Sequence, residues 1–183
     1  MSLIHIPSVT EIISFVNSRA FDDIPSYMLV RAQDRGTDVH SGAAAHLAGL
    51  WHEVDPAHEG YMDSLRPWAS QFIVKTIWVE KALSSEKLGF KGHPDALLQM
   101  VGDLGLTLVD WKTPKPLSKS WRLQLAGYKI LCEENGYKIS RVASLRLDAN
   151  GGPAKFEGYT KTLAADSNVF ISALNVWKFY NLN

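Results

Sequence analysis

The chain has 183 residues, of which 46% are hydrophobic and 21% charged, a composition typical of one folded domain over residues 1–183 rather than of a disordered chain. Its 19 basic and 19 acidic residues cancel, which excludes the strongly basic surface of a general nucleic-acid binder, so any phosphate-binding surface must be local. The single cysteine excludes an internal disulfide and an iron–sulfur cluster held within this chain, and it is typical of a reducing cytoplasm.

The N-terminal segment predicts a short helix. Ser8 and Glu11 have the spacing of a capping box, and the apolar residues of Ile12 to Val16 follow directly. The segment lacks a basic first region and carries Glu11 inside its apolar part, so it is not typical of a signal peptide. No stretch approaches the roughly 18 apolar residues of a membrane helix. We therefore expect a soluble, cytoplasmic protein without a membrane partner.

Two more helices are predicted before the first strand. One begins near Gly36 and runs to Trp51, because its alanines and leucine favour helix. Turn and charge signals occupy Val54 to Gly60, and a further helix from Tyr61 to Ser70 is expected to be interrupted by Pro67.

Four segments rich in β-branched, aromatic and aliphatic residues predict strands that are sequential neighbours in one sheet. The second of them is expected to be bent or bulged around Gly92 and Pro94, and the turn at Gly102 to Gly105 separates it from the third. The four segments are Gln71 to Glu80, Leu88 to Met100, Leu106 to Lys112, and Ile139 to Leu147.

A helix is predicted between the third and fourth strands, opened by Ser118 or Ser120 and closed by Gly136. A strand, a helix and a strand in that order indicate a crossover connection between parallel strands. A last strand over Lys155 to Lys161 and an amphipathic helix over Asn168 to Tyr180 complete the chain. The expected fold class is α/β, a single domain with a central mixed sheet flanked by helices.

The chemistry-bearing residues lie on the second and third of these strands. Because side chains alternate along a strand, Asp110 and Lys112 project from the same face, and Asp95 follows Pro94 on the neighbouring strand. Carboxylates can hold a divalent metal that activates water, and a nearby ammonium can stabilise negative charge that develops on a phosphate. These three residues therefore predict hydrolysis of phosphodiester bonds.

Pro94-Asp95 and Asp110-Trp111-Lys112 resemble, letter for letter, the pattern after which the PD-(D/E)XK nuclease superfamily is named. The chain is similar to the branch that holds the nuclease domain of the RecBCD helicase–nuclease, the CRISPR-associated exonucleases and the lambda-type phage recombination exonucleases. The resemblance covers about Ile6 to Leu147. It implies a restriction-endonuclease-like core and a Mg²⁺- or Mn²⁺-dependent deoxyribonuclease, an exonuclease of DNA repair, recombination or phage DNA processing.

Two further elements resemble the metal site of that branch. The segment Arg35 to His40 is similar to its Gly-x-x-Val-His helix start, which implies that His40 contributes to the metal site. Glu80, at the end of the first strand, is expected to join or support the metal ligands, with Glu86 as the fallback. The expected ligand set is therefore Asp95, Asp110, His40 and Glu80.

Gln124 and Tyr128 resemble the Gln-x-x-x-Tyr motif that follows the catalytic lysine in the branch. Four residues apart on a helix, they share a face and can point at DNA or at Lys112. The neighbouring loop and helix start predict a local nucleic-acid-binding patch with one stacking aromatic. Its members are Lys115, Lys119, Arg122 and Trp121.

The implied partner is DNA, with a free end if the exonuclease branch applies. The chain lacks the cluster cysteines of many relatives and a Gly-x-x-x-x-Gly-Lys phosphate loop, so it resembles a cluster-free nuclease module alone. Three alternatives stay open: a restriction-type endonuclease, a catalytically idle nuclease-like protein that binds DNA or a partner, and an unrelated α/β protein. The sequence also leaves open the polarity, the strand preference, a homo-oligomeric state and a recombination partner protein.

Overall fold

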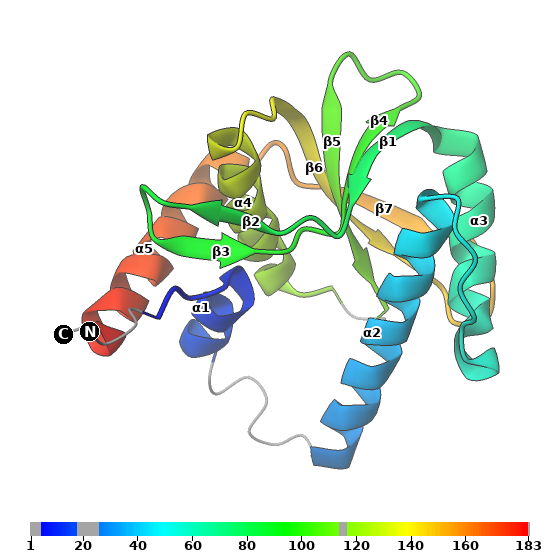
Figure 1. The fold of residues 1–183 in the computed structure, drawn as a ribbon, viewed down its shortest axis with the longest axis horizontal. Coiled ribbons are helices and arrows are strands. Elements are labelled where there is room, and N and C mark those ends of the chain that lie inside the picture. The colour runs from blue at the N-terminus through cyan, green and yellow to red at the C-terminus, as the bar shows by residue number, and fades with distance from the viewer. Residues whose placement is uncertain (1–4, 18–25, 114–116, 183) are drawn as a thin grey trace.

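A five-stranded mixed sheet lies at the centre of the computed structural model, which describes residues 5–17, 26–113 and 117–182 (Figure 1). Strands β5 and β6 are parallel, and every other neighbouring pair in this sheet is antiparallel. The expected mixed α/β fold is therefore confirmed. In sheet order the strands are β1 (Ile73–Val79), β4 (Ala96–Met100), β5 (Leu106–Lys112), β6 (Ile139–Arg146) and β7 (Lys155–Gly158).

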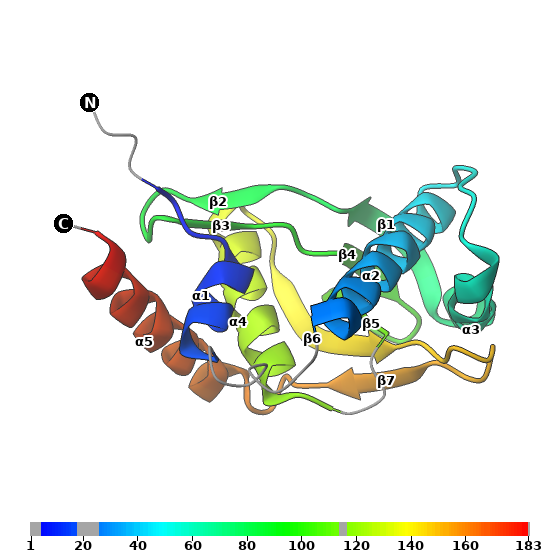
Figure 2. The same ribbon diagram turned by 90° about the horizontal axis from the view of Figure 1, so that it is seen from below.

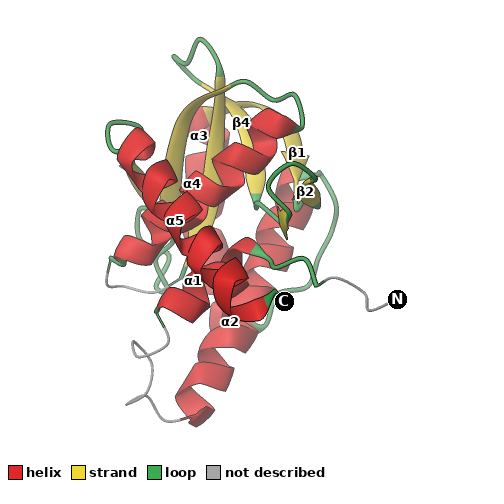
Figure 3. Ribbon diagram, turned by 90° about the vertical axis from the view of Figure 1, so that its left-hand side faces the viewer, coloured by secondary structure: helices red, strands yellow, loops and turns green. Residues whose placement is uncertain are grey.

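Helices cover both faces of the sheet (Figures 1 and 2). One face packs against α1 (Val9–Val16), α4 (Lys119–Glu134) and α5 (Leu163–Asn181), which lie in front of the strands in Figure 3. The other face packs against α2 (Ser26–Leu47) and α3 (Glu59–Phe72). Each face has its own apolar core, so β5, which lies between them, is buried along most of its length.

The prediction of one bent strand over Leu88 to Met100 was wrong. Its first part forms β3 (Phe90–Gly92), which pairs with β2 (Leu83–Ser85) in a separate two-stranded sheet that the sequence analysis missed. Its second part is β4 of the main sheet. Pro94 lies in the break between them, and its nitrogen has no hydrogen to donate to a ladder. The break also leaves Asp95 directly before β4.

Several predicted boundaries differ from those observed. Helix α2 begins at Ser26 rather than near Gly36, because the residues before Gly36 are good helix formers and one glycine costs only about 1 kcal/mol. Pro67 does not interrupt α3, since the buried face of this helix outweighs the lost backbone hydrogen bond. Strand β7 is shorter, and α5 longer, than predicted.

The predicted caps and the crossover were confirmed. Ser8 and Glu11 form both hydrogen bonds of a capping box, and Ser118 caps α4. Gly136 follows α4 with a positive φ of 86°, a conformation that favours glycine. Because α4 connects the parallel strands β5 and β6, its first turns lie beside the end of β5. The β5 residues that face α4 therefore meet its side chains.

None of the helices that the structure describes combines the length and the apolar character that crossing a bilayer requires. A short 3₁₀ helix over Pro56–His58 connects α2 to α3.

Candidate active site

Asp95 and Asp110 face each other across two paired strands. The β4–β5 register pairs Ala96 with Val109, and one step further places Asp95 opposite Asp110. Opposed residues of antiparallel strands have Cβ atoms about 5 Å apart. Both residues are buried, at 4% and 1% exposure, so two carboxylates meet inside the protein. Buried carboxylates at this separation need a compensating positive charge.

His40 and Glu80 converge on Asp95. The Nδ1 atom of His40 lies 3.4 Å from Asp95 Oδ1 and 3.9 Å from Glu80 Oε1. One ligand atom from each of the three residues lies within 4.8 Å of the other two, which is compatible with a shared metal ion. His40 lies on α2, Glu80 directly follows β1, and Asp95 directly precedes β4. Glu86, the fallback for Glu80, is not a member of this group.

The backbone of Trp111 orients two of these side chains. Its N–H donates a hydrogen bond of 2.7 Å to Asp95 Oδ2, and its carbonyl oxygen lies 3.2 Å from His40 Nε2. Because a carbonyl can only accept, His40 must carry a proton on Nε2. Nδ1 is then the nitrogen that faces the two carboxylates. A hydrogen bond of this kind on the outer nitrogen is how metal-binding histidines are usually held.

Glu80 adopts a strained backbone conformation. Its φ of 45° lies in the left-handed region, and it is the only non-glycine residue with a positive φ in the described part of the chain. Its N–H donates a hydrogen bond of 2.8 Å to the carbonyl oxygen of Asp95, so the turn is held against the start of β4. Strained residues concentrate at functional sites, where their surroundings hold them. Here the turn directs the carboxylate of Glu80 toward His40.

A second series of polar side-chain contacts runs from Asp110 to α4. The ammonium of Lys112 pairs with Asp110 Oδ2 and donates a hydrogen bond of 2.8 Å to Gln124 Oε1. The amide nitrogen of Gln124 in turn donates to the Tyr128 hydroxyl at 3.1 Å. Tyr128 is 4% exposed, so it supports Gln124 from inside the core instead of lining an open cleft.

The protonation equilibria of the site reflect crowded acidic groups. Burial opposes protonation of His40, but the charges of Asp95 and Asp110 outweigh it and raise its pKa to about 9. Burial, together with the Asp95 charge, raises the pKa of Glu80 to about 7. Burial also raises the pKa of Asp110 to about 6, although the Lys112 charge opposes the shift. The site thus favours added positive charge.

The residues present fit a divalent cation. Asp110 Oδ1 is buried and accepts no hydrogen bond from any residue in the described ranges, so it is an acceptor that lacks a partner. Carboxylate oxygens are the ligands that Mg²⁺ and Mn²⁺ share, and an imidazole nitrogen is more typical of Mn²⁺ than of Mg²⁺. Asp95, Glu80, His40 and Asp110 therefore form a donor set suited to either ion.

Among the described residues of the predicted nucleic-acid patch, Arg122 and Trp121 have partners inside the protein, and Lys119 is exposed. Arg122 is held by Asp166 through two hydrogen bonds of 3.1 and 2.6 Å, so its guanidinium is committed within the protein. Trp121 is 6% exposed and lies 5.8 Å from the Lys112 ammonium, so it forms a wall of the site and offers no stacking surface. Lys119 is exposed at the first turn of α4. Lys115 lies outside the described residues.

Sequence reasoning missed the contribution of the Trp111 main chain, because a backbone hydrogen bond leaves no mark on residue type. It also missed an open cleft that borders the cluster, lined by residues of α2 and by Glu80. The cleft residues are Gly36, Thr37, His40, Ser41 and Glu80. The strain at Glu80 likewise has no signal in the sequence, since glycine or asparagine is the usual residue at such positions.

No model of a known protein family matches the chain, and a search of curated proteins found no significant match. Among solved structures, the chain is similar to the alkaline exonuclease LHK-Exo from Laribacter hongkongensis, at 15% identity and a TM-score of 0.41, over 78% of this chain and 84% of that one. The complex of LHK-Exo with dAMP matches at 15% identity and a TM-score of 0.40 over the same shares. Likeness at this level does not indicate an activity, which has to be inferred from the side chains themselves.

Proposed function

We propose that the chain is a divalent-metal-dependent nuclease that hydrolyses phosphodiester bonds of DNA. The observation that carries the proposal is the convergence of His40, Glu80 and Asp95 within 4.8 Å, beside the strand that carries the Asp110–Lys112 ion pair. An acidic cluster that is partly open to solvent, with one ordered ammonium beside it, matches what phosphodiester hydrolysis requires.

Asp95, Glu80, His40 and Asp110 are the residues that would hold Mg²⁺ or Mn²⁺. A divalent ion in such a site lowers the pKa of bound water and neutralises charge on the phosphate. The protein's own contribution is to fix the donors. The Trp111 backbone sets the orientation of the Asp95 carboxylate and the ring orientation of His40, and the Glu80 turn is tied to the Asp95 carbonyl.

Lys112 is proposed to stabilise charge that grows on the phosphate oxygens during hydrolysis. Its side chain is 12% exposed and its ammonium contacts both Asp110 and Gln124, so its position is set before DNA binds. A preorganised charge of this kind avoids the reorganisation that water would need around the transition state. Gln124 and Tyr128 act on the reaction through Lys112 and are positioning residues.

The finer proposal is an exonuclease that acts on DNA with a free end in repair, recombination or phage DNA processing. Two positions support it, as the resemblance implies: His40 lies close to Glu80 and Asp95, and Gln124 contacts Lys112. An inactive binding protein is disfavoured because Asp95, Asp110 and Lys112 are all present and mutually oriented. A restriction-type endonuclease shares the same core residues and differs in its product pattern.

The test is incubation of the purified chain with end-labelled linear DNA and with closed circular DNA, in Mg²⁺, in Mn²⁺ and in a chelator. We expect metal-dependent loss of the linear substrate, no cutting with the chelator, and an intact circle. Asp95→Asn should be inactive, whereas the matched control Asp34→Asn, an exposed acid on α2, should cut like the wild type. Cleavage of the circle would favour the endonuclease, and no cleavage in either metal would refute the proposal.

A further inference from the structure

Three basic residues occupy one row across neighbouring strands. The β5–β6 register places Lys112 opposite Arg146, and the β6–β7 register places Arg146 opposite Lys155. Residues opposite each other on paired strands project from the same face, and strands are spaced about 4.8 Å apart. The row therefore extends roughly 10 Å from the Lys112 backbone to that of Lys155, away from the candidate metal ligands on the β4 side of β5.

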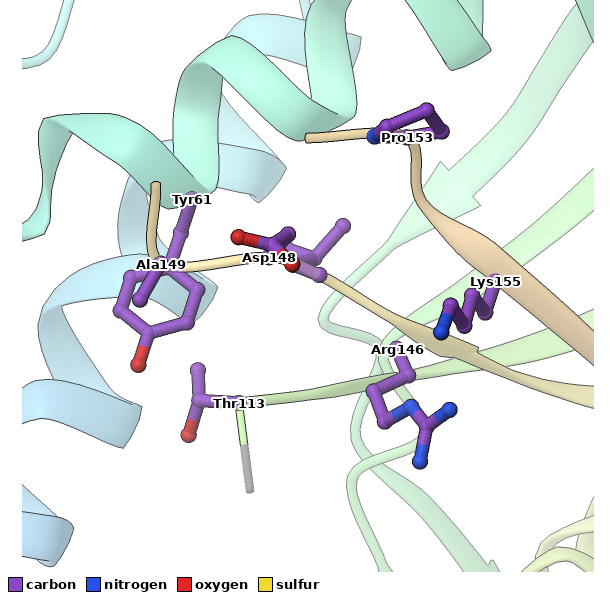
Figure 4. Close-up of a pocket in the computed structure, with 8 residues that line it drawn as sticks. Tyr61, Thr113, Arg146, Asp148, Ala149, Pro153 and Lys155 are labelled. Carbon is purple, nitrogen blue, oxygen red and sulfur yellow. The ribbon is translucent and has the colours of Figure 1, made fainter. Parts of the chain in front are cut away.

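A pocket of about 290 Å³ lies at the outer end of this row. Figure 4 shows Lys155 extending from β7 toward Arg146 on β6, with Thr113 and Tyr61 across the pocket. Thr113 follows Lys112 directly in the chain, so the pocket borders the end of β5 that carries the ammonium. Its volume is several times the ~30 Å³ share of one water molecule, which leaves room for a hydrated anion.

The lining of the pocket holds more basic than acidic side chains. Asp148 lines the wall, and its Oδ1 atom already accepts a hydrogen bond of 2.8 Å from the N–H of Asn150. Glu157 lies two residues from Lys155 on the same face of β7 and pairs with Ser144, opposite Asp110, so it belongs to the neighbouring acidic row. Two cations and one acid thus line the pocket itself.

We propose that Arg146 and Lys155 form a subsite for a backbone phosphate of the nucleic acid, next to the phosphate at Lys112. The inference rests on the proposed nuclease function for the identity of the ligand. In a chain whose overall charge is zero, local clusters of this kind are how a phosphate backbone can be attracted. The row gives the backbone a path from the site across β6 to the edge strand β7, where the exposed Lys155 meets it first.

The test is the salt dependence of DNA binding in a chelator, where cleavage is absent, measured by fluorescence anisotropy with a labelled single-stranded oligonucleotide. Lys155→Ala should weaken DNA binding roughly three- to tenfold. It should also make the negative slope of log binding constant against log salt concentration less steep by about 0.7, the value for one phosphate contact to a single strand. Lys155→Glu should weaken binding more. Lys75→Ala is the matched control, because Lys75 is an exposed lysine on β1, the opposite edge strand.

The two proposals fail in different ways. If the wild type binds DNA, and Lys155→Ala alone lowers the salt slope, the subsite is supported whether or not the chain cuts DNA. If the chain cuts DNA but Lys155→Ala and Lys75→Ala have the same slope as the wild type, the subsite is wrong and the nuclease stands. An equal fall in slope for both variants would also overturn the subsite, because it would reflect total charge. Absence of DNA binding by the wild type would overturn it as well.

Discussion

The ammonium of Lys112 donates a hydrogen bond of 2.8 Å to the side-chain oxygen of Gln124, which joins the end of β5 to the second turn of α4. Because the amide of Gln124 is uncharged, this contact holds the Lys112 ammonium in place without neutralising its charge. The ammonium is also paired with Asp110. Any test of the mechanism should therefore separate the charge of Lys112 from the residues that position it.

Replacing Lys112 by Ala should lower single-turnover cleavage on the order of a hundredfold or more, as loss of a preorganised electrostatic group commonly does. The metal-free variant should also lose stability, because the buried Asp110 loses its ion-pair partner, so its folding is checked by circular dichroism. Lys119→Ala is the comparison, since the exposed Lys119 can only contact the DNA backbone and should affect binding more than saturated turnover. Near-normal cleavage by the Lys112 variant would remove the central role assigned to it.

Gln124→Ala should lower turnover about ten- to a hundredfold, the range typical of residues that orient functional groups. Tyr128→Phe should have a milder, severalfold effect, since it removes only the hydroxyl that accepts from Gln124. Both variants should lower kcat more than they raise KM, because the proposed role of Lys112 is in the transition state. A rise in KM at unchanged kcat would indicate instead that these residues bind DNA directly.

Asp95→Asn should weaken metal binding at least ten- to a hundredfold, because the amide keeps an acceptor for the Trp111 N–H but loses the charge. For the wild type, metal at about 100 times its Kd should raise the free energy of unfolding by about 2.7 kcal/mol. Thermal unfolding of both proteins with and without Mn²⁺ measures the difference. Equal stabilisation of the variant would show that Asp95 is not a ligand.

Stabilisation by metal should increase with pH. In the metal-free protein the pKa of His40 is raised from 6.5 to about 9, that of Glu80 from 4.5 to about 7, and that of Asp110 from 3.8 to about 6. When folding raises the pKa of a group, its contribution to the free energy of unfolding is fully present below the pKa of the unfolded state. The contribution is lost as pH rises through the pKa of the folded state. The metal-free site therefore loses stability between about pH 4 and 9, whereas metal binds the deprotonated groups more tightly over that range. The increase in Tm on adding Mg²⁺, measured from pH 6 to 8.5, should grow with pH; a flat or falling profile would contradict it.

Gly92→Ala should disturb the site from outside it. A Cβ atom at Gly92 would lie 2.8 Å from Tyr128 Cε1 and 2.9 Å from Leu131 Cδ1, so Tyr128 must shift. Overpacking of this kind costs about 1–3 kcal/mol, and the shift should lower turnover severalfold through Gln124. Gly158→Ala, in β7, meets no neighbour within 4 Å and serves as the control. Unchanged turnover in a destabilised Gly92 variant would show that Tyr128 does not position Lys112.

The main strands and the residues of the central cluster could be predicted from the sequence, because they depend on local periodicity and on residue type. Strand β5 was predicted at its observed bounds, and its alternation placed Asp110 and Lys112 on one face. The α4 caps followed from Ser118 and Gly136. That His40 lies beside Asp95 depends on the tertiary packing of α2, and only the family resemblance pointed to it.

Features that arise from tertiary contacts were not predictable. The commitment of Arg122 to Asp166 joins α4 to α5 across 44 residues, and no local pattern announces it. The separation of β3 from β4 depends on pairing with β2, whose three residues are too few to show a period. The left-handed turn at Glu80 is imposed by the start of β4, against the preference of the residue itself.

Trp111, the residue between Asp110 and Lys112, serves the site through its main chain. The N–H and the carbonyl of this residue hold Asp95 and His40, while its side chain is fully buried in the core between the sheet and α3. Every amino acid except proline carries the N–H that this task requires. The side chain at position 111 thus contributes volume to the core, and the main chain contributes the hydrogen bonds of the site. An inspection of side chains alone would overlook Trp111, whose main chain anchors Asp95 and His40.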